Sequence, residues 1–248
     1  MAEILRLNDL PKVQVERVIG PVLGLLLTDL VVQLLGEDHP LDGYEVVAPE
    51  FPLKKETADS STNIDWLVVH RASRRVVLVE LKTSARSMDY EQLATYTSVQ
   101  DRVVRTGGGF LMDDVQSIRK ASREKAKYGH LLRTCERTGP AVRAAETATI
   151  LYLAPRGAMP LPSGHTDLIH RVFSSLPAVV SGELAAQWLV VREALVKLDG
   201  AVAGAAGAVA RTVDTGTPAH EDRILTNLER IGETRVPLRF CLGTSGHQ

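Results

Sequence analysis

Two short apolar runs separated by a polar stretch are the feature that most constrains the fold of this chain. Ile64–His70 (IDWLVVH) and Val76–Lys82 (VVLVELK) are rich in β-branched and aliphatic residues, and Arg71–Arg75 between them is polar. This length and composition predict a β-hairpin. Because both runs are apolar on both faces, they are typical of strands in the middle of a covered sheet.

Helical and extended segments alternate along the rest of the chain. The spacing of apolar residues, together with capping and turn residues, predicts six further elements. They are a helix over Val13–Leu35 ended by Gly36, an extended segment over Tyr44–Leu53, a helix from an N-cap at Ser87 to about Arg105, a basic helix over Val115–Arg137, a strand over Thr149–Ala154 and a helix over Gly182–Asp199. This interleaving predicts an α/β layer structure with a mixed sheet, flanked by helices.

The last part of the chain differs in composition. Residues 200–216 are rich in glycine and alanine, which predicts either a soft helix or a linker. A short amphipathic helix is expected over Glu221–Ile231, before a polar tail. We therefore expect one domain over residues 1–199, with extra helices in its C-terminal third, and a separate segment over 200–248.

Overall composition limits the classes of protein and of site. A chain of 248 residues with 44% hydrophobic residues is long enough for a sizeable globular core. The formal net charge is −1, so any nucleic-acid binding would need a local basic patch. Cys135 and Cys241 form no CxxC pair, which argues against a zinc site or a disulfide framework.

Neither secretion nor membrane insertion is expected. The first 18 residues carry charges at intervals, unlike a secretory signal. The longest apolar stretch, Pro21–Leu35, contains Asp29 and Gln33, so it predicts a buried helix rather than a membrane span. A cytoplasmic protein without a membrane partner is the expectation.

Two carboxylates and a lysine interrupt the apolar hairpin. Glu80 and Lys82 are two residues apart, so on a strand they point to the same side of the sheet. If the hairpin is centred between Ala72 and Ser73, Asp65 and Glu80 are equally far from that centre and lie opposite each other. Directly opposed residues have Cβ atoms roughly 4.5–5.5 Å apart. A loop with an odd number of residues would break this register.

Opposed carboxylates repel each other, and the repulsion destabilises a sheet unless a cation lies between them. Mg²⁺ and Mn²⁺ suit such hard oxygen ligands. Lys82 adds positive charge that could stabilise a transition-state phosphate or orient an attacking water. A metal to activate water and a cation to meet developing negative charge are what phosphodiester hydrolysis needs. Asp65, Glu80 and Lys82 are therefore candidate catalytic residues.

The segment IDWLVVHRASRRVVLVELK resembles the PD-(D/E)XK nuclease superfamily. The family pattern is an acidic residue at the end of one strand and Glu-x-Lys on the next, and here it reads Asp65, then Glu80-Leu81-Lys82. Ile64 stands where the pattern often has proline. The resemblance implies a restriction-endonuclease-like fold and a metal-dependent nuclease, with DNA as the expected substrate. It also implies that Asp65, Glu80 and the Leu81 carbonyl bind Mg²⁺ or Mn²⁺, and that Lys82 is the catalytic lysine.

The following helix extends the resemblance. Gln92 and Tyr96 form a Gln-x-x-x-Tyr pattern, as in the branch that includes bacterial recombination exonucleases, and at i and i+4 they face one direction. In that branch such residues line the active site and contact the DNA strand; alternatively, they simply pack the helix against the sheet. The branch also has a glutamate on an early helix near the metal. Glu16 is the candidate here, with Asp29 or Glu50 as alternatives.

A basic run near the middle of the chain has two interpretations. It is either a surface that tracks phosphates or a solvated helix face balanced by Glu124 and Glu136. Its members are Arg119, Lys120, Arg123, Lys125, Lys127, Arg133 and Arg137.

Three functions follow from these patterns. The first is a metal-dependent nuclease. The second is a catalytically inactive module with the same fold that binds nucleic acid or protein. The third is an unrelated α/β protein in which Asp65 and Lys82 form a plain salt bridge.

Overall fold

The computed structural model describes residues 12–36, 43–55, 60–83, 89–156, 168–178, 180 and 184–212, with side chains from residue 19 to residue 199 within these ranges. The chain divides into two compact units, residues 1–206 and 207–248. The sheet, the sites and all of the helices described below belong to the first unit, except the last six residues of the C-terminal helix, 207–212.

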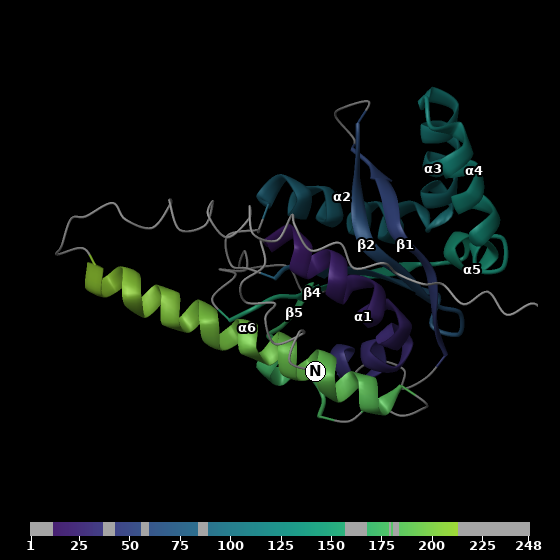
Figure 1. Ribbon diagram of the computed structural model, residues 1–248. Helices are drawn as coiled ribbons and strands as arrows, with labels where there is room; N and C mark the ends of the chain where they lie inside the picture. Colours follow the sequence, from purple (N-terminus) through teal and green to yellow (C-terminus); the bar gives the residue numbers. More distant parts are fainter. Residues whose placement is uncertain are drawn as a thin grey trace, which may run out of the picture. The chain divides into compact units, whose positions relative to one another are not determined.

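A five-stranded mixed sheet forms the centre of this unit (Figure 1). The strands are β1 (Tyr44–Lys54), β2 (Ser61–His70), β3 (Arg75–Leu81), β4 (Thr147–Leu153) and β5 (Leu168–Arg171), and they lie side by side in chain order. β1, β2 and β3 pair antiparallel, whereas β3, β4 and β5 pair parallel. The chain is therefore a mixed α/β protein, as the sequence predicts.

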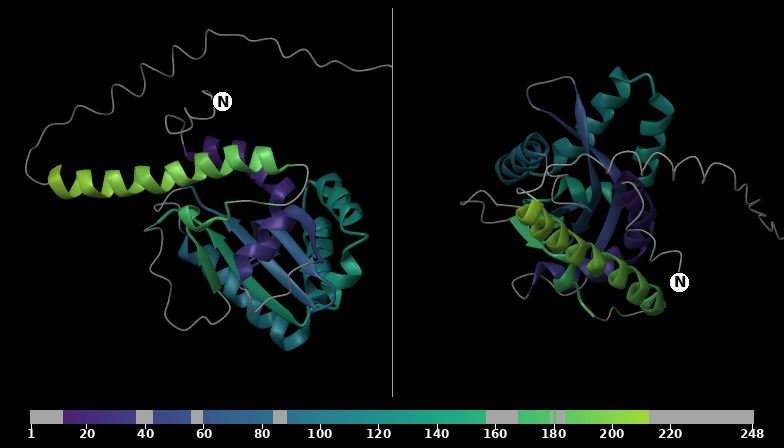
Figure 2. Two further views of the ribbon diagram at one scale, coloured as in Figure 1. Left: turned by 90° about the horizontal axis from the view of Figure 1, so that it is seen from below. Right: turned by 60° about the vertical axis from the view of Figure 1, so that its left-hand side comes forward.

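Helices cover both faces of the sheet (Figure 2). They are α1 (Lys12–Leu35), α2 (Tyr90–Thr106), α3 (Gly109–Ala121), α4 (Lys125–Thr134), α5 (Gly139–Arg143), the 3₁₀ turn η3 (Phe173–Ser175) and α6 (Ala185–Thr212). On one face, residues of α1 and α6 such as Leu27 and Trp188 pack against the sheet. On the other face, α2, α3 and α5 contribute residues such as Tyr96 and Val115 to a second core. This arrangement buries both faces of the hairpin strands.

Close packing of α1 against the sheet depends on one glycine. A Cβ atom at Gly24 would lie 2.9 Å from Nε1 of Trp66, the buried tryptophan of β2. The helix ends at Gly36, whose φ of 95° is the left-handed conformation that glycine adopts without strain. Among the described residues, no helix has both the length and the hydropathy that a membrane span requires.

Several expectations from the sequence are confirmed. The hairpin forms with β2 and β3 as its strands, and Trp66 pairs with Val79 as a turn centred between Ala72 and Ser73 requires. β1 is an edge strand with a register shift between Val46 and Ala48, in agreement with its prolines.

Other expectations are wrong. The basic helix expected over Val115–Arg137 is two helices, α3 and α4, because the chain extends at Ser122 (ψ 149°) and the Ser122 hydroxyl accepts a bond from the Glu124 amide (2.9 Å). The observed N-cap of α2 is Asp89, whose carboxylate accepts bonds from the amides of Glu91 and Gln92. Ser87, the expected N-cap, lies outside the described residues.

The C-terminal part also differs from the expected elements. β5 and α5 are not predicted from the sequence, because both are very short. α6 continues to Thr212, beyond the expected end at Asp199, so the start of the Gly/Ala-rich segment is helical. The helix expected over Glu221–Ile231 lies outside the described residues.

Candidate active site

The two acidic residues of the hairpin lie opposite each other at the end of the β2–β3 ladder. The last paired residues are Trp66 and Val79; the same register, continued by one step, puts Asp65 opposite Glu80, whose charge acts on the Asp65 carboxyl. Beyond this point the Leu81 amide donates to Asp65 Oδ2 (2.7 Å) instead of to a strand carbonyl. The Asp65 carboxylate therefore replaces a backbone acceptor and is held at the mouth of the hairpin.

Glu80 is a buried carboxylate with both oxygens in use. Its side chain is 2% exposed, and its Oε1 forms an ion pair with Lys82 Nζ. Its Oε2 accepts a hydrogen bond from the Tyr96 hydroxyl (2.8 Å). Tyr96 also lies 3.1 Å from the carbonyl of Asn63, but its single proton can serve only one strong bond at a time. These contacts fix the orientation of Glu80.

Lys82 is held by the following helix. Its Nζ donates to Gln92 Oε1 (2.9 Å), and Gln92 Nε2 in turn donates to the Asn63 carbonyl (3.4 Å). The Lys82 side chain is 12% exposed, so it is more accessible to solvent than Glu80, which is 2% exposed. Gln92 and Tyr96 lie one turn apart on α2, so the same helix face holds both Lys82 and Glu80.

The structure thus brings together five of the residues singled out from the sequence. They are Asp65, Glu80, Lys82, Gln92 and Tyr96. Gln92 and Tyr96 do more than pack α2 against the sheet. Gln92 bonds Lys82, and Tyr96 bonds Glu80. The ion pair on this face joins Lys82 to Glu80 rather than to Asp65.

Burial and mutual repulsion change the ionisation of the two acids. Desolvation raises the pKa of Asp65 from its ordinary value of 3.8 to about 8; the nearby Glu80 charge adds to this effect, whereas the Leu81 amide and Lys82 oppose it. Desolvation also raises the pKa of Glu80, against the opposing effects of Lys82 and Tyr96. One lysine therefore does not compensate the two carboxylates.

The chemistry of this donor set is of the kind that binds a divalent cation. The two carboxylates are not neutralised by Lys82 alone, and their oxygens are the hard ligands that Mg²⁺ and Mn²⁺ prefer. Mg²⁺ keeps several waters and is commonly held by one or two carboxylates. The described residues contain no group of three or more His, Cys, Asp or Glu side chains that could hold a metal. Waters and backbone would therefore have to complete the coordination of an ion at Asp65 and Glu80.

The three candidates for an additional acid differ in position. Glu16 lies on α1, among the residues whose side chains are not described. Asp29 also lies on α1, the helix that packs on the sheet face opposite to α2. Glu50 lies on β1 near the site, where its charge contributes to the raised pKa of Asp65 and its Oε2 accepts a bond from Asn63 (3.3 Å). Of these, Glu50 has an observed interaction with the candidate site.

Two residues of the site were not found from the sequence. Asn63 contributes its backbone carbonyl, an acceptor for both Gln92 and Tyr96, and a backbone role leaves no signal in residue type. Tyr152 lies opposite Glu80 in the parallel β3–β4 pairing, fully buried. Its hydroxyl has no hydrogen-bond partner among the described residues. Tyr152 lies beside Glu80 because β3 pairs with β4, a strand that is far away in the sequence.

Comparison with known proteins adds nothing to this geometry. No protein-family model, no curated protein and no solved structure matches the chain.

Proposed function

We propose that this chain is a metal-dependent nuclease of the PD-(D/E)XK type with a restriction-endonuclease-like core, and that it hydrolyses phosphodiester bonds in DNA. The observation that carries the proposal is the convergence of Asp65, Glu80 and Lys82 at the open end of one hairpin. A five-stranded mixed sheet flanked by helices on both faces is compatible with that fold.

The energetic cost of this cluster supports a functional role. Burying a carboxylate without full compensation is unfavourable, and an ion pair in the interior often fails to repay the loss of hydration. A hydrophobic residue at position 80 would continue the apolar pattern of β3, where the preceding four residues are fully buried aliphatic side chains. A charged residue in this place is therefore better explained by chemistry than by stability.

Each residue has a defined role in the proposed reaction. When bound, a divalent ion would lower the pKa of a water and polarise the phosphate. Asp65, Glu80 and the Leu81 carbonyl would hold the ion. Lys82 would donate a hydrogen bond to a phosphate oxygen as negative charge develops there.

The helix α2 positions these groups. Gln92 keeps the Lys82 ammonium beside Glu80 through the 2.9 Å bond to its amide oxygen. Tyr96 fixes the second oxygen of Glu80. Both side chains hold reacting groups in a single geometry before substrate arrives, which lowers the cost of organising them in the transition state.

A second candidate function is a binding module that keeps the fold without catalysis. The observation in its favour is that Lys82 and Tyr96 already occupy both oxygens of Glu80, so a metal ion would have to compete with them. Calorimetry separates the two candidates. The nuclease requires Mn²⁺ binding that Asp65→Asn and Glu80→Gln abolish, whereas the module gives no heat that depends on these residues.

The direct test is cleavage of linear and circular DNA in the presence of Mg²⁺ or Mn²⁺. Glu80→Gln and Lys82→Ala should each lower the rate at least about 100-fold, the usual effect of removing one group that stabilises the transition state. The matched control is the exposed pair on α6, Glu193→Gln and Lys197→Ala, whose charges lie 2.8 Å apart. Equal cleavage by the Glu80 and control variants would refute the proposal.

A further inference from the structure

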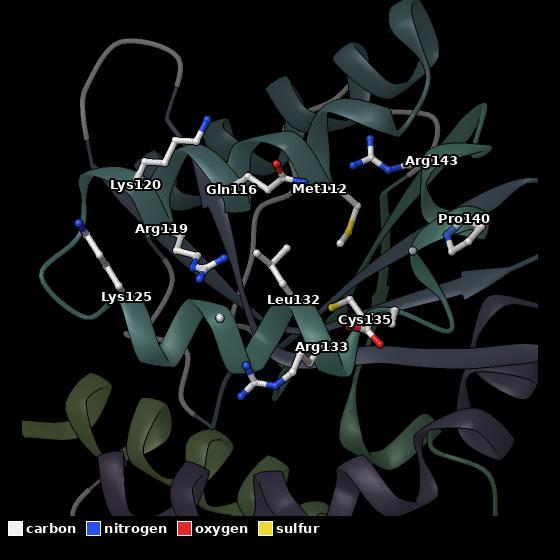
Figure 3. A pocket seen from close by; sticks show the side chains of 13 residues that line it. Met112, Gln116, Arg119, Lys120, Lys125, Leu132, Arg133, Cys135, Pro140 and Arg143 are labelled. Atoms are coloured by element: carbon white, nitrogen blue, oxygen red, sulfur yellow. The ribbon is translucent and has the colours of Figure 1, made fainter.

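A groove lies between α3, α4 and α5, apart from the candidate active site (Figure 3). It encloses about 880 Å³, within the size range of ligand pockets and well above that of one small anion. Its lining shares no residue with the Asp65–Glu80–Lys82 cluster. The separation of α3 from α4 at Ser122 creates this groove, because one continuous helix would have no facing wall.

The lining of the groove is strongly cationic. Five basic side chains and a single carboxylate, Glu136, border it. Arg143 forms an ion pair with Asp113 (2.9 Å). The other four are not in an ion pair with any residue that the structure describes: they are Arg119, Lys120, Lys125 and Arg133. In a chain with a net charge of −1, this is a local excess of positive charge.

The expected balance by neighbouring glutamates is only partial. Glu124 pairs with Lys127, which does not line the groove. Glu136 lines the groove but forms no ion pair with a described residue. Four basic side chains and one carboxylate along a single groove give it an excess of positive charge, which favours the entry of an anion.

The Arg119 guanidinium of α3 packs against the backbone of α4 inside the groove. Figure 3 shows Arg119 extending from α3 toward α4. A Cβ atom at Gly129 of α4 would lie 3.6–3.7 Å from the Arg119 guanidinium, so the group packs over the glycine. Met112, Leu132 and Cys135 form apolar parts of the lining between the two helices. The cations therefore border an apolar floor rather than a uniformly hydrated surface.

We infer that this groove binds the phosphodiester backbone of a nucleic-acid strand. Lys125 and Arg133 are eight residues apart on α4, which is about 12 Å along a helix. That length corresponds to several phosphates of one strand, since successive phosphates advance about 3.4 Å along a duplex axis. Two further cations, Arg119 and Lys120 of α3, also line this groove. A row of separate cations on two walls suits a linear polyanion better than a single phosphate.

This binding is independent of cleavage, so it is measured without metal. We expect that a fluorescein-labelled oligonucleotide binds the full chain in EDTA, with an affinity that falls steeply as salt rises. Arg119→Gln/Arg133→Gln, which removes one cation from each wall, should weaken binding at least tenfold. The salt slope of log K should decrease by about 1.4–1.8, the counterion release of two phosphate contacts.

The matched control removes the same charge elsewhere. Arg105 and Lys127 are exposed and do not line the groove, so Arg105→Gln/Lys127→Gln should change affinity less than twofold. Similar losses in both double variants would show non-specific attraction and overturn the inference, as would no loss in either. Competition by inorganic phosphate or a mononucleotide as effective as the oligonucleotide would also overturn it, in favour of a small-anion pocket. A wild-type chain that binds the oligonucleotide but does not cleave DNA with Mg²⁺ or Mn²⁺ would leave this inference intact and refute only the nuclease proposal.

Discussion

The two faces of β3 are equally buried but chemically different. Glu80 and Leu81 are adjacent and are 2% and 3% exposed. Leu81 points into the aliphatic core under α1 and α6, where hydrophobic packing alone explains the residue. Glu80 points toward α2 and makes its contacts with Lys82 and Tyr96. Burial of Leu81 therefore stabilises the protein, whereas burial of the Glu80 carboxylate destabilises it. A functional explanation is needed for the face that carries Glu80.

Substitution of the two neighbours should separate these roles most strongly. Leu81→Ala removes a buried side chain from the α1 face, so we expect a loss of about 2–5 kcal/mol in the free energy of unfolding. Its backbone carbonyl remains, so cleavage per folded molecule should change little. Urea unfolding and the cleavage rate, measured on the same samples, check both expectations.

Lys82→Ala is the counterpart on the other face. It leaves the buried Glu80 carboxylate without its ion-pair partner, so we expect a large loss of cleavage per folded molecule together with a loss of stability. If Leu81→Ala abolished cleavage in protein that is fully folded, the two faces would be coupled and the separation of roles would be wrong.

Divalent ions should stabilise only the α2 face of this pair. At a free Mn²⁺ concentration about 100 times its dissociation constant, binding to the folded state adds about 2.7 kcal/mol to stability. For a chain of this size each kcal/mol raises Tm by about 2–4 °C. Thermal unfolding of the wild type and of Glu80→Gln, with and without Mn²⁺, measures the effect. The shift should disappear in Glu80→Gln and persist in Leu81→Ala.

The contrast between the two faces also explains how much the sequence could predict. The opposition of Asp65 and Glu80 follows from a short hairpin, because in an antiparallel pair the turn alone sets the register. The contacts of Gln92 and Tyr96 follow from helical spacing and from the resemblance. Tyr152 could not be placed beside Glu80, because parallel strands are joined by long connections that carry no information on register.

The basic groove could not be predicted for a different reason. From the sequence, the cations from Arg119 to Arg133 belong to one long helix, on which they would spread around its surface. At the break, the hydroxyl of Ser122 accepts a hydrogen bond from the Glu124 amide. Serine is common inside helices and at their ends, so its identity does not decide between the two.

The pH dependence of stability should report the strain at Asp65. With a folded-state pKa of about 8 and an ordinary value of 3.8, this carboxyl is protonated in the folded protein and ionised in the unfolded chain between these pH values. The unfolded state then binds fewer protons than the folded state. The contribution of Asp65 to the free energy of unfolding therefore falls as pH rises from about 4 to about 8, and is constant above pH 8. Asp65→Asn should therefore be more stable than the wild type at pH 8.5, by roughly 1–3 kcal/mol, within the range of single substitutions.

Urea unfolding of the wild type and of Asp65→Asn at pH 5 and pH 8.5 isolates this group from the other titrating residues. The amide oxygen of asparagine still accepts the Leu81 amide, so the hairpin end stays closed. Mn²⁺ should narrow the difference at pH 8.5, since the ion binds the ionised carboxylate of the wild type. If the stability difference between the wild type and Asp65→Asn were the same at pH 5 and pH 8.5, Asp65 would ionise with its ordinary pKa. The Asp65–Glu80 region would then have no shortage of positive charge.

The smallest expected effect compares two tyrosines that both approach Glu80. The Tyr96 hydroxyl bonds the carboxylate, and bonds to charged groups are worth about 1.5–3 kcal/mol, so Tyr96→Phe should destabilise the protein by this amount. The Tyr152 hydroxyl is buried and has no partner among the described residues, so Tyr152→Phe removes a group that already lacks its hydrogen bond and should change stability by less than about 1 kcal/mol, in either direction. Urea unfolding of both variants without metal gives the comparison. A loss in Tyr152→Phe as large as in Tyr96→Phe would mean that this hydroxyl has a partner such as a bound water, and that the polar region around Glu80 extends across β4 as well as along α2.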